Sequence, residues 1–274
     1  MASLDEAFSH HPRQPGRPVV FRGRGFTAAP YRGASWIAFA VLLLLWEASI
    51  RFGWIGELFL PAPSSVLDAL WQLAADGTLG RHLGASLLRL SVGWTLGTLF
   101  GITAGFAIGI WSLARAVGIP VISAFFPIPK IALLPLFILW LGIGEPAKFL
   151  TIALGVFFPT AIATFSALDA VPRNLIRMAQ SFDVPWVDIL RKVVLPGAMP
   201  GILAAFRITA SVALLLLVSA EMIGAQYGIG AFVLSAGSLM QTDALLAGVL
   251  VLSITGLIIG TALSKIEKLL LKWR

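Results

Sequence analysis

The sequence predicts an all-α membrane protein with six transmembrane helices and a helix-turn-helix in one cytoplasmic loop. Three observations predict this fold class: 58% of the 274 residues are hydrophobic, only 12% are charged, and the mean hydropathy is +0.91. Soluble domains contain about 45–50% apolar and about 25% charged residues. The composition therefore excludes a soluble globular enzyme, and it excludes a disordered chain, which needs low hydrophobicity.

The sequence also excludes several kinds of chemistry. It has no cysteine and only three histidines, His10, His11 and His82. Disulfide scaffolds, thiolate metal sites and cysteine nucleophiles are excluded, and the histidines are too scattered for a histidine-rich metal site. It contains no phosphate-cradling loop, zinc-ligand spacing or nucleophile elbow. We expect no catalytic residues, no metal and no cofactor bound by this chain.

The chain divides into a polar tail and an apolar domain. Residues 1–33 include five arginines and are expected to form a basic disordered cytoplasmic tail, because the apolar stretch begins too late for a signal peptide. Residues 34–274 form the transmembrane domain. A bilayer core of about 30 Å needs about 20 helical residues. Six segments meet that length: 34–52, 84–110, 119–141, 147–168, 201–224 and 244–263.

The basic residues predict the orientation of these spans. With the tail in the cytoplasm, fourteen of the 20 Lys and Arg residues fall in cytoplasmic segments and three in outer segments. This asymmetry follows the positive-inside rule and predicts that both termini are cytoplasmic. The net charge of +7 is then a consequence of topology, since basic loops face anionic lipid. No nucleic-acid partner is expected.

The second span has a glycine at every fourth position. The five residues are Gly93, Gly97, Gly101, Gly105 and Gly109. Small residues at this spacing let another helix approach closely. Tight packing within the chain is the favoured interpretation, and a contact between subunits or a pore lining remains open.

Lys130 lies near the middle of the third span, among four prolines. Proline removes a backbone donor, and irregular backbone inside a bilayer needs cover from protein or from a water-filled cavity. Lys130 therefore has two interpretations. It lines a translocation path that favours anions, or it neutralises carbonyls freed by the prolines or reaches an interface.

Three further ionisable residues lie near the outer face: Glu47, Arg89 and Glu221. We expect a Glu–Arg pair among them, and a structural role is favoured over a functional one. Glu221 and Arg89 nevertheless join Lys130 as candidates for the translocation path or its outer gate.

The loop at residues 169–200 is long, basic and cytoplasmic. A first amphipathic helix is predicted over residues 173–182, and a second follows with Asp183 as its N-cap and ends at Leu195-Pro196. The apolar positions of the second helix recur at helical spacing: Trp186, Ile189, Leu190 and Val193. This helix-turn-helix indicates a docking surface, and the alternative is a loop that packs on its own spans.

At this loop the sequence resembles permeases of binding-protein-dependent ABC importers. Their motif is Glu-Ala-Ala, three residues, Gly, nine residues and Ile-x-Leu-Pro. Alignment on Val193-Val194-Leu195-Pro196 places Arg177-Met178-Ala179 at Glu-Ala-Ala and Asp183 at the glycine. Asp tolerates left-handed backbone better than most residues, so we expect the turn to survive. The role of the motif's glutamate is not carried over to Arg177.

The resemblance extends over about residues 35–270 and is greatest to the nitrate/sulfonate/taurine branch of these permeases. The segments that carry it are Pro61-Ala62-Pro63, His82-Leu83, Ser86-Leu87-Leu88-Arg89, residues 135–145, residues 191–202 and residues 220–225. It implies a type I ABC importer permease fold in the bacterial inner (cytoplasmic) membrane.

The resemblance also implies the partners and the mechanism. Two identical permease subunits would form a homodimer with the pore between them, and two cytoplasmic ATP-binding subunits would hold ATP and Mg. A periplasmic or lipid-anchored binding protein would deliver the solute, which would cross by alternating access. The expected solute is a small anion like nitrate, a sulfonate or taurine, and related importers of neutral or cationic heterocycles keep its identity open.

The residues expected to couple the loop to the ATPase are Arg173, Leu175, Arg177, Met178, Ala179, Ser181, Phe182, Asp183, Trp186 and Ile189. Two other classes of protein are alternatives. A secondary transporter driven by an ion gradient would need broken helices in both halves of an inverted repeat. A membrane-embedded enzyme would need paired ionisable groups at one depth, for which only Glu47, Arg89 and Glu221 qualify.

Overall fold

A computed structural model describes residues 33–272 of the chain. Almost the whole predicted tail, residues 1–32, lies outside this range. The chain divides into two units, Met1–Ala48 and Ser49–Arg274, which are described separately. The described residues form helices and connecting turns, with no strand among them. The helices are α1 (Ala34–Arg51), α2 (Pro63–Ala75), α3 (Thr78–Ile110), α4 (Ser112–Phe125), η2 (Lys130–Leu133), α5 (Leu134–Leu141), α6 (Glu145–Asp169), α7 (Arg173–Ser181), α8 (Trp186–Ile189), η3 (Leu190–Val194), α9 (Leu195–Met222), α10 (Ile229–Ser238) and α11 (Thr242–Leu270).

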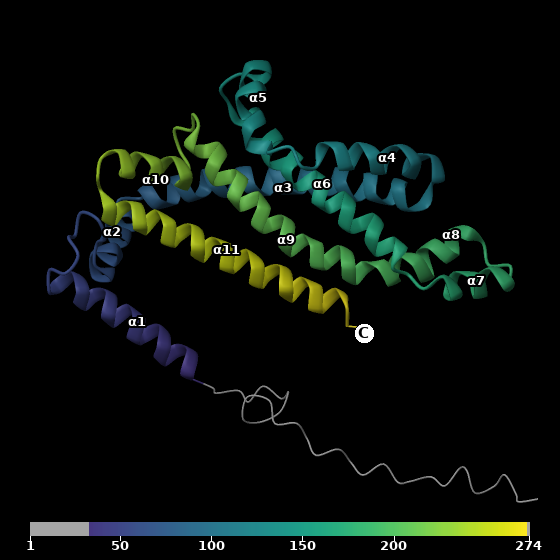
Figure 1. Cartoon of the computed structure of the whole chain (residues 1–274), viewed down its shortest axis with the longest axis horizontal. Helices are drawn as coiled ribbons and strands as arrows, with labels where there is room; N and C mark the ends of the chain where they lie inside the picture. Colours follow the sequence, from purple (N-terminus) through teal and green to yellow (C-terminus); the bar gives the residue numbers. More distant parts are fainter. Residues whose placement is uncertain (1–32, 273–274) are drawn as a thin grey trace, which may run out of the picture. The chain divides into compact units, whose positions relative to one another are not determined.

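Helices α3, α6, α9 and α11 form the body of the second unit. Helix α6 packs against α3 on one side and α9 on the other, and α11 packs against α9. The short helix α10 lies where α9 ends and α11 begins, and α7 and α8 lie at the opposite end of α9 (Figure 1). The two ends of α6 and α9 therefore carry different structures.

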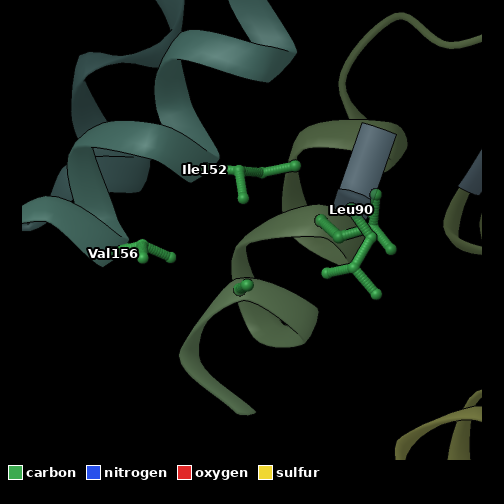
Figure 2. Close-up of a cluster of buried hydrophobic side chains, with 5 residues drawn as sticks. Leu90, Ile152 and Val156 are labelled. Carbon is green, nitrogen blue, oxygen red and sulfur yellow. The ribbon is translucent and has the colours of Figure 1, made fainter. Parts of the chain in front are cut away.

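Figure 2 shows the apolar cluster that joins three of these helices. Leu90 of α3 meets Ile152 and Val156 of α6, and Ala213 and Leu217 of α9 complete the cluster. All five side chains are buried. Because lipid tails are as apolar as leucine, such a contact stabilises a membrane bundle through close van der Waals packing rather than through exclusion of water.

The glycine repeat of α3 packs against α6. A Cβ atom on Gly97 would lie 2.4 Å from the carbonyl oxygen of Ala153, and one on Gly105 would lie 2.5 Å from Cβ of Thr164. The other three glycines meet α6 side chains just as closely. Packing within the chain, the favoured interpretation of the repeat, is confirmed.

Fewer spans are evident than the six predicted. Within residues 33–272, four helical segments are long and apolar enough to cross a membrane: α3, α6, the continuous stretch Trp186–Met222 and α11. The bent pair of Ser112–Phe125 and Lys130–Leu141 would make a fifth. Helix α1 coincides with the predicted first span at residues 34–52, and its crossing of a membrane stays a prediction.

The third predicted span, residues 119–141, is not one straight helix. Its first half belongs to α4, which begins earlier, at Ser112, and its two halves meet at an angle of 85°. Pro127 and Pro129 occupy the break between Phe125 and Lys130. Since proline cannot donate a backbone hydrogen bond, two prolines in three residues end the helix.

The predicted end of the second loop helix at Leu195-Pro196 is wrong. Helix α8 passes through the π-helical turn η3 directly into α9, so the chain is helical from Trp186 to Met222. Pro196 lies in the first turn of α9, where proline is tolerated. The N–H of Leu195 donates to the carbonyl of Leu190, five residues earlier, and Pro196 has no N–H to donate.

Two short helices complete the fold. Helix α10 is too short for a span and was not predicted. Helix α2 begins at Pro63, so Ser64 and Ser65 lie in its first turn. Between α2 and α3 the Asp76 carboxylate accepts a hydrogen bond from the backbone N–H of Thr78 at 2.8 Å, which holds the pKa of Asp76 below its usual value.

Candidate functional site

A buried ion-pair network joins α3, α6 and α9. Arg89 of α3 donates from Nε and Nη2 to the two carboxylate oxygens of Glu145, at 2.6 and 2.7 Å. Its Nη1 donates to Oε1 of Glu221 at 2.8 Å. The guanidinium therefore binds one carboxylate in two places and a second carboxylate in one. We call Arg89, Glu145 and Glu221 the ionic clamp.

Glu221 is fully buried, and its carboxylate has several donors. The hydroxyl of Ser86 lies 2.8 and 3.0 Å from its two oxygens, and the backbone N–H of Gly230 donates to Oε2 at 2.9 Å. A Cβ on Gly228 would lie 2.4 Å from the carboxyl carbon, and its φ of +140° favours glycine. The chain thus supplies the hydrogen bonds that a buried carboxylate needs.

The clamp ties the turn between α9 and α10 to the rest of the bundle. The Nη1 atom of Arg89 also donates to the carbonyl of Tyr227, and Nδ1 of His82 lies 2.9 Å from the carbonyl oxygen of Gly228. Lys148 adds a second cation, 3.6 Å from Glu145. Together with Lys148, the clamp residues join α3, α6, α9 and the turn before α10.

The clamp contains the Glu–Arg pair that the sequence predicted, formed by Arg89 and Glu221. Glu145 was missed because it lies just outside the predicted span 147–168. A signal was present in the chain: Gly142, Gly144 and Pro146 mark the start of a helix at Glu145, and α6 does begin there. Because Glu221 is enclosed by its own chain, the geometry favours a structural role, and a role for Arg89 and Glu221 at the translocation path stays a prediction.

Lys130 lies at the break between α4 and α5. Its Nζ donates to the backbone carbonyls of Phe125, Phe126 and Ile128, at 2.9, 2.6 and 2.7 Å. The ammonium also lies 4.7 Å from the ring centroid of Phe158, within the range of a cation–π contact. Of its two interpretations, this geometry favours the neutralisation of carbonyls, and an anion path at Lys130 stays a prediction.

The turn after α7 has the backbone geometry expected from the loop motif. Asp183 has φ +53°, in the left-handed region. Its N–H donates to the carbonyl of Gln180 at 3.0 Å, and the N–H of Val184 donates to Ala179 at 3.2 Å. These two bonds form a Schellman motif, in which glycine usually occupies the position of Asp183. The expectation that aspartate preserves this turn is confirmed.

Five large apolar side chains on α7, α8 and the turn between them are exposed. Phe182 is 76% exposed and Trp186 is 63% exposed. We call four of the five residues the α7–α8 surface: Leu175, Met178, Phe182 and Trp186. Contiguous exposed apolar groups at the end of a helical bundle indicate a binding surface.

The opposite face of α7 and α8 packs toward the bundle. Ile189 is buried and Ile176 is partly buried. Both line a cavity of about 430 Å³ with Arg115 and Asp169, and Trp186 of the α7–α8 surface reaches the same cavity. Those two residues form an ion pair that links α4 to the end of α6. Ile189, which was predicted to belong to the coupling group, thus anchors the element rather than facing outward.

The remaining residues of the predicted coupling group lie on α7. Arg173 begins the helix and lines the same cavity, and Arg177 is exposed. Ala179 accepts the Schellman hydrogen bond, and the hydroxyl of Ser181 donates to the carbonyl of Arg177 at 3.0 Å. The structure therefore brings the group together in one element. No cluster of metal-binding side chains occurs within residues 33–272.

Comparisons with known proteins match this architecture. A family model described as "Binding-protein-dependent transport system inner membrane component" matches residues 97–273. The taurine transport system permease protein TauC of Escherichia coli (strain K12) is 38% identical over 239 residues, which cover 85% of this chain and 87% of TauC. SsuC of Bacillus subtilis (strain 168), a candidate aliphatic sulfonates transport permease protein, is 33% identical over 235 residues, 86% of this chain and 85% of SsuC.

Solved structures agree with the fold. A chain of the MetNI methionine ABC transporter, in an inward-facing conformation, aligns with a TM-score of 0.57 and 25% identity, over 67% of this chain and 91% of its own length. A second inward-facing MetNI structure aligns with a TM-score of 0.58 and 21% identity, over 76% and 97%. The second comparison supports the fold alone.

The apolar bundle and the exposed element at its end define a multi-pass membrane transport subunit. The chain belongs to the family of inner-membrane permease components of binding-protein-dependent transport systems.

Proposed function

We propose that this chain is the permease of an ATP-driven importer, and that α7 and α8 couple it to a separate ATPase. The single observation that carries the coupling role is the α7–α8 surface. Phe182 and Trp186 are exposed, while Ile189 fixes the same element to the bundle. An element that is anchored on one face and apolar on the other can transmit the motion of a partner into the attached helices α6 and α9.

The partner would be one of two ATP-binding subunits, which carry ATP and Mg. The binding site on that subunit would be an apolar cleft that receives Phe182 and Trp186, with Arg173 and Arg177 at its rim. A second copy of this chain would complete the translocation path, and an external binding protein would deliver the solute. The MetNI likeness supports this assembly, because those neighbours come from an ABC transporter.

The proposed solute is a small sulfonate-like anion. The names of the relatives support this class: TauC is a taurine permease, and SsuC is a candidate permease for aliphatic sulfonates. Both relatives match over most of their length. A neutral or cationic heterocycle is the alternative solute class.

The proposed topology has six spans and two cytoplasmic termini. Helix α1 would supply the first span and the bent α4–α5 pair the third, beside the four long apolar segments. The basic residues support the orientation, since most of them lie in the tail, the α7–α8 loop and the end of α11.

Reconstitution tests this function. The chain, its genetically linked ATPase and its binding protein are incorporated into proteoliposomes, and uptake of radiolabelled taurine is measured with and without ATP. We expect ATP-dependent uptake and a complex with two copies each of permease and ATPase by native mass spectrometry. Phe182→Asp should abolish uptake and release the ATPase, whereas Phe59→Asp, at an exposed position in the turn before α2, should retain the ATPase.

Two results would contradict the proposal. Uptake could be independent of ATP and be lost when an ionophore dissipates the ion gradient. That result would favour a secondary transporter. Full ATPase binding by the Phe182→Asp variant would remove α7 and α8 from the coupling role. ATP-dependent uptake of a different solute, with none of taurine, would reject only the proposed solute class.

A further inference from the structure

A groove between α9 and α11 contains cationic side chains that the proposed function does not use. Its volume is about 520 Å³. We call it the basic groove, and the lining residues that matter here are Arg207 and Ser211 from α9 and Gly256, Gly260, Lys265 and Lys268 from α11.

Small residues line the floor of the basic groove, and the space above them is open. Gly256, Gly260 and Ser264 recur at intervals of four along α11, so they share one face of the helix. A Cβ atom on Gly260 would meet nothing within 4 Å, and one on Gly256 would lie 3.3 Å from Cδ1 of Leu214. The chain itself leaves the space above Gly260 unfilled.

The charges in the groove are not balanced. Arg207 pairs with Glu267. Lys265 and Lys268 are exposed and have no ion-pair partner within the part of the chain that the structure describes. Two unpaired cations therefore stand at one end of the groove. An anionic ligand is the chemistry that complements them.

The groove changes character along α11. Lys265 and Lys268 lie in the last turns of the helix, which ends at Leu270. Toward the middle of the helix, Gly256 and the exposed Leu257 give the groove an apolar stretch. An anionic phospholipid has the same order of chemistry, with a charged headgroup at the membrane surface and acyl chains toward its centre.

We propose that the basic groove binds one anionic phospholipid. Lys265 and Lys268 hold its phosphate, and an acyl chain lies over Gly256 and Gly260. The Ser264 hydroxyl already donates to the carbonyl of Gly260 at 2.8 Å, so the lysines are the donors to the phosphate. Basic pockets between membrane helices bind anionic headgroups in this way. A small transported anion would not need the apolar stretch.

Native mass spectrometry tests the charge requirement. The intact complex in mild detergent is titrated with phosphatidylglycerol and, in parallel, with phosphatidylcholine. We expect tighter binding of phosphatidylglycerol and about a fivefold loss of affinity for Lys268→Gln. The matched control is Lys272→Gln, which removes the same charge four residues further on, at an exposed position that does not line the groove. This variant should bind the lipid as the natural sequence does.

A second variant tests the shape requirement without changing any charge. Gly260→Leu should fill the groove and abolish binding, because the added side chain would occupy the proposed position of the acyl chain. Gly84→Leu on α3 is its control, since a Cβ there also meets nothing within 4 Å. Both variants add the same side chain to a helix where it does not clash, so the fold should persist.

Five outcomes would overturn the proposal. They are equal binding of the two lipids, unchanged phosphatidylglycerol binding by Gly260→Leu, and equal losses for Lys268→Gln and Lys272→Gln. The fourth is displacement of the lipid by excess inorganic phosphate, which would assign the lysines to a free anion. A loss of permease pairing in Lys268→Gln, with lipid binding intact, would assign the groove to a second copy and would equally reject the lipid.

Discussion

The two ends of α6 and α9 differ in how their side chains are satisfied: one end buries paired charges, and the other exposes apolar groups. At one end, the ionic clamp of Arg89, Glu145 and Glu221 brings charged groups together and supplies donors for the buried carboxylate from within the chain. At the other end, the α7–α8 surface leaves Phe182 and Trp186 exposed. At the clamp, the chain itself provides the partners of the buried charged groups. At the α7–α8 surface, the exposed aromatic side chains are of the kind that a partner protein buries in an interface.

The comparison separates folding from coupling. Substitutions in the clamp should change the stability of the permease itself, because they leave buried charges unpaired. Substitutions in the α7–α8 surface should leave stability unchanged and weaken association with a partner. A residue that lowers both would show that the two ends are not independent.

The largest expected effect is that of Glu221→Ala. It removes the carboxylate that Arg89, Ser86 and Gly230 contact, and the buried guanidinium keeps Glu145 as its one remaining carboxylate, beside the carbonyl of Tyr227. Breaking a buried pair by removing one partner costs about 3–5 kcal/mol. We expect a decrease of that size in the free energy of unfolding, measured by denaturant titration in mixed micelles. Asp188→Asn is the control, since its pair with Lys192 is largely exposed. Equal stability of the two variants would contradict the role of the clamp.

Gly228→Ala should have a smaller effect at the same end. The new methyl group would lie 2.4 Å from the carboxyl carbon of Glu221, and the φ of +140° disfavours any residue with a Cβ. Overpacking costs about 1–3 kcal/mol. Unfolding in mixed micelles should shift accordingly, and Gly80→Ala, where the added carbon meets nothing within 4 Å, should not shift by this mechanism. An unshifted Gly228→Ala would mean that the turn before α10 relaxes away from the clamp.

Lys130→Met should lower the free energy of unfolding moderately. Lys130 belongs neither to the ionic clamp nor to the α7–α8 surface. The substitution keeps the apolar stem and removes three hydrogen bonds to backbone carbonyls. Each bond to a charged group is worth about 1.5–3 kcal/mol when buried, and partial exposure should reduce the total loss to about 1–2 kcal/mol.

The measurement for Lys130→Met combines unfolding with uptake. If Lys130 only neutralises carbonyls, the stability falls and the uptake of anionic and neutral solutes declines together. A selective loss of anion uptake at unchanged stability would instead place Lys130 on the translocation path.

The sequence predicted features that depend on local chemistry. A Glu–Arg pair was expected among Glu47, Arg89 and Glu221, and the structure pairs Arg89 with Glu221. Close packing of the glycine repeat within the chain was also expected, and the structure identifies α6 as the partner helix. The left-handed turn followed from placing Asp183 at the glycine of the loop motif. In each case the residue type itself restricts the outcome, since burial demands a partner and a left-handed backbone restricts the side chain.

The features that the sequence did not predict depend on three-dimensional arrangement. For Lys130 the sequence left two interpretations open, the neutralisation of carbonyls and an anion path, because the direction of the carbonyls at an 85° bend decides between them. The continuation of α8 into α9 depends on a π turn before Pro196, and sequence rules place a helix end there. Glu145 was not predicted as a site residue because the predicted span began at residue 147, two residues after α6 begins.

The smallest expected effect is at Asp183, where the α7–α8 surface depends on backbone rather than on side-chain chemistry. Asp183→Gly should keep the left-handed turn and should bind the ATPase at least as well, because glycine adopts φ +53° without strain. Asp183→Val should weaken ATPase association without changing the free energy of unfolding of the bundle, because a left-handed β-branched residue costs about 1–2 kcal/mol at this turn. The Schellman bonds from Asp183 and Val184 would be lost, and the spacing of Phe182 and Trp186 would change with them.

Association is measured by titrating the ATPase onto the permease in nanodiscs, with Asp183→Asn as the matched control because asparagine also tolerates this conformation. If Asp183→Val bound as tightly as Asp183→Gly, the turn would not position the surface, and the exposed side chains alone would determine docking.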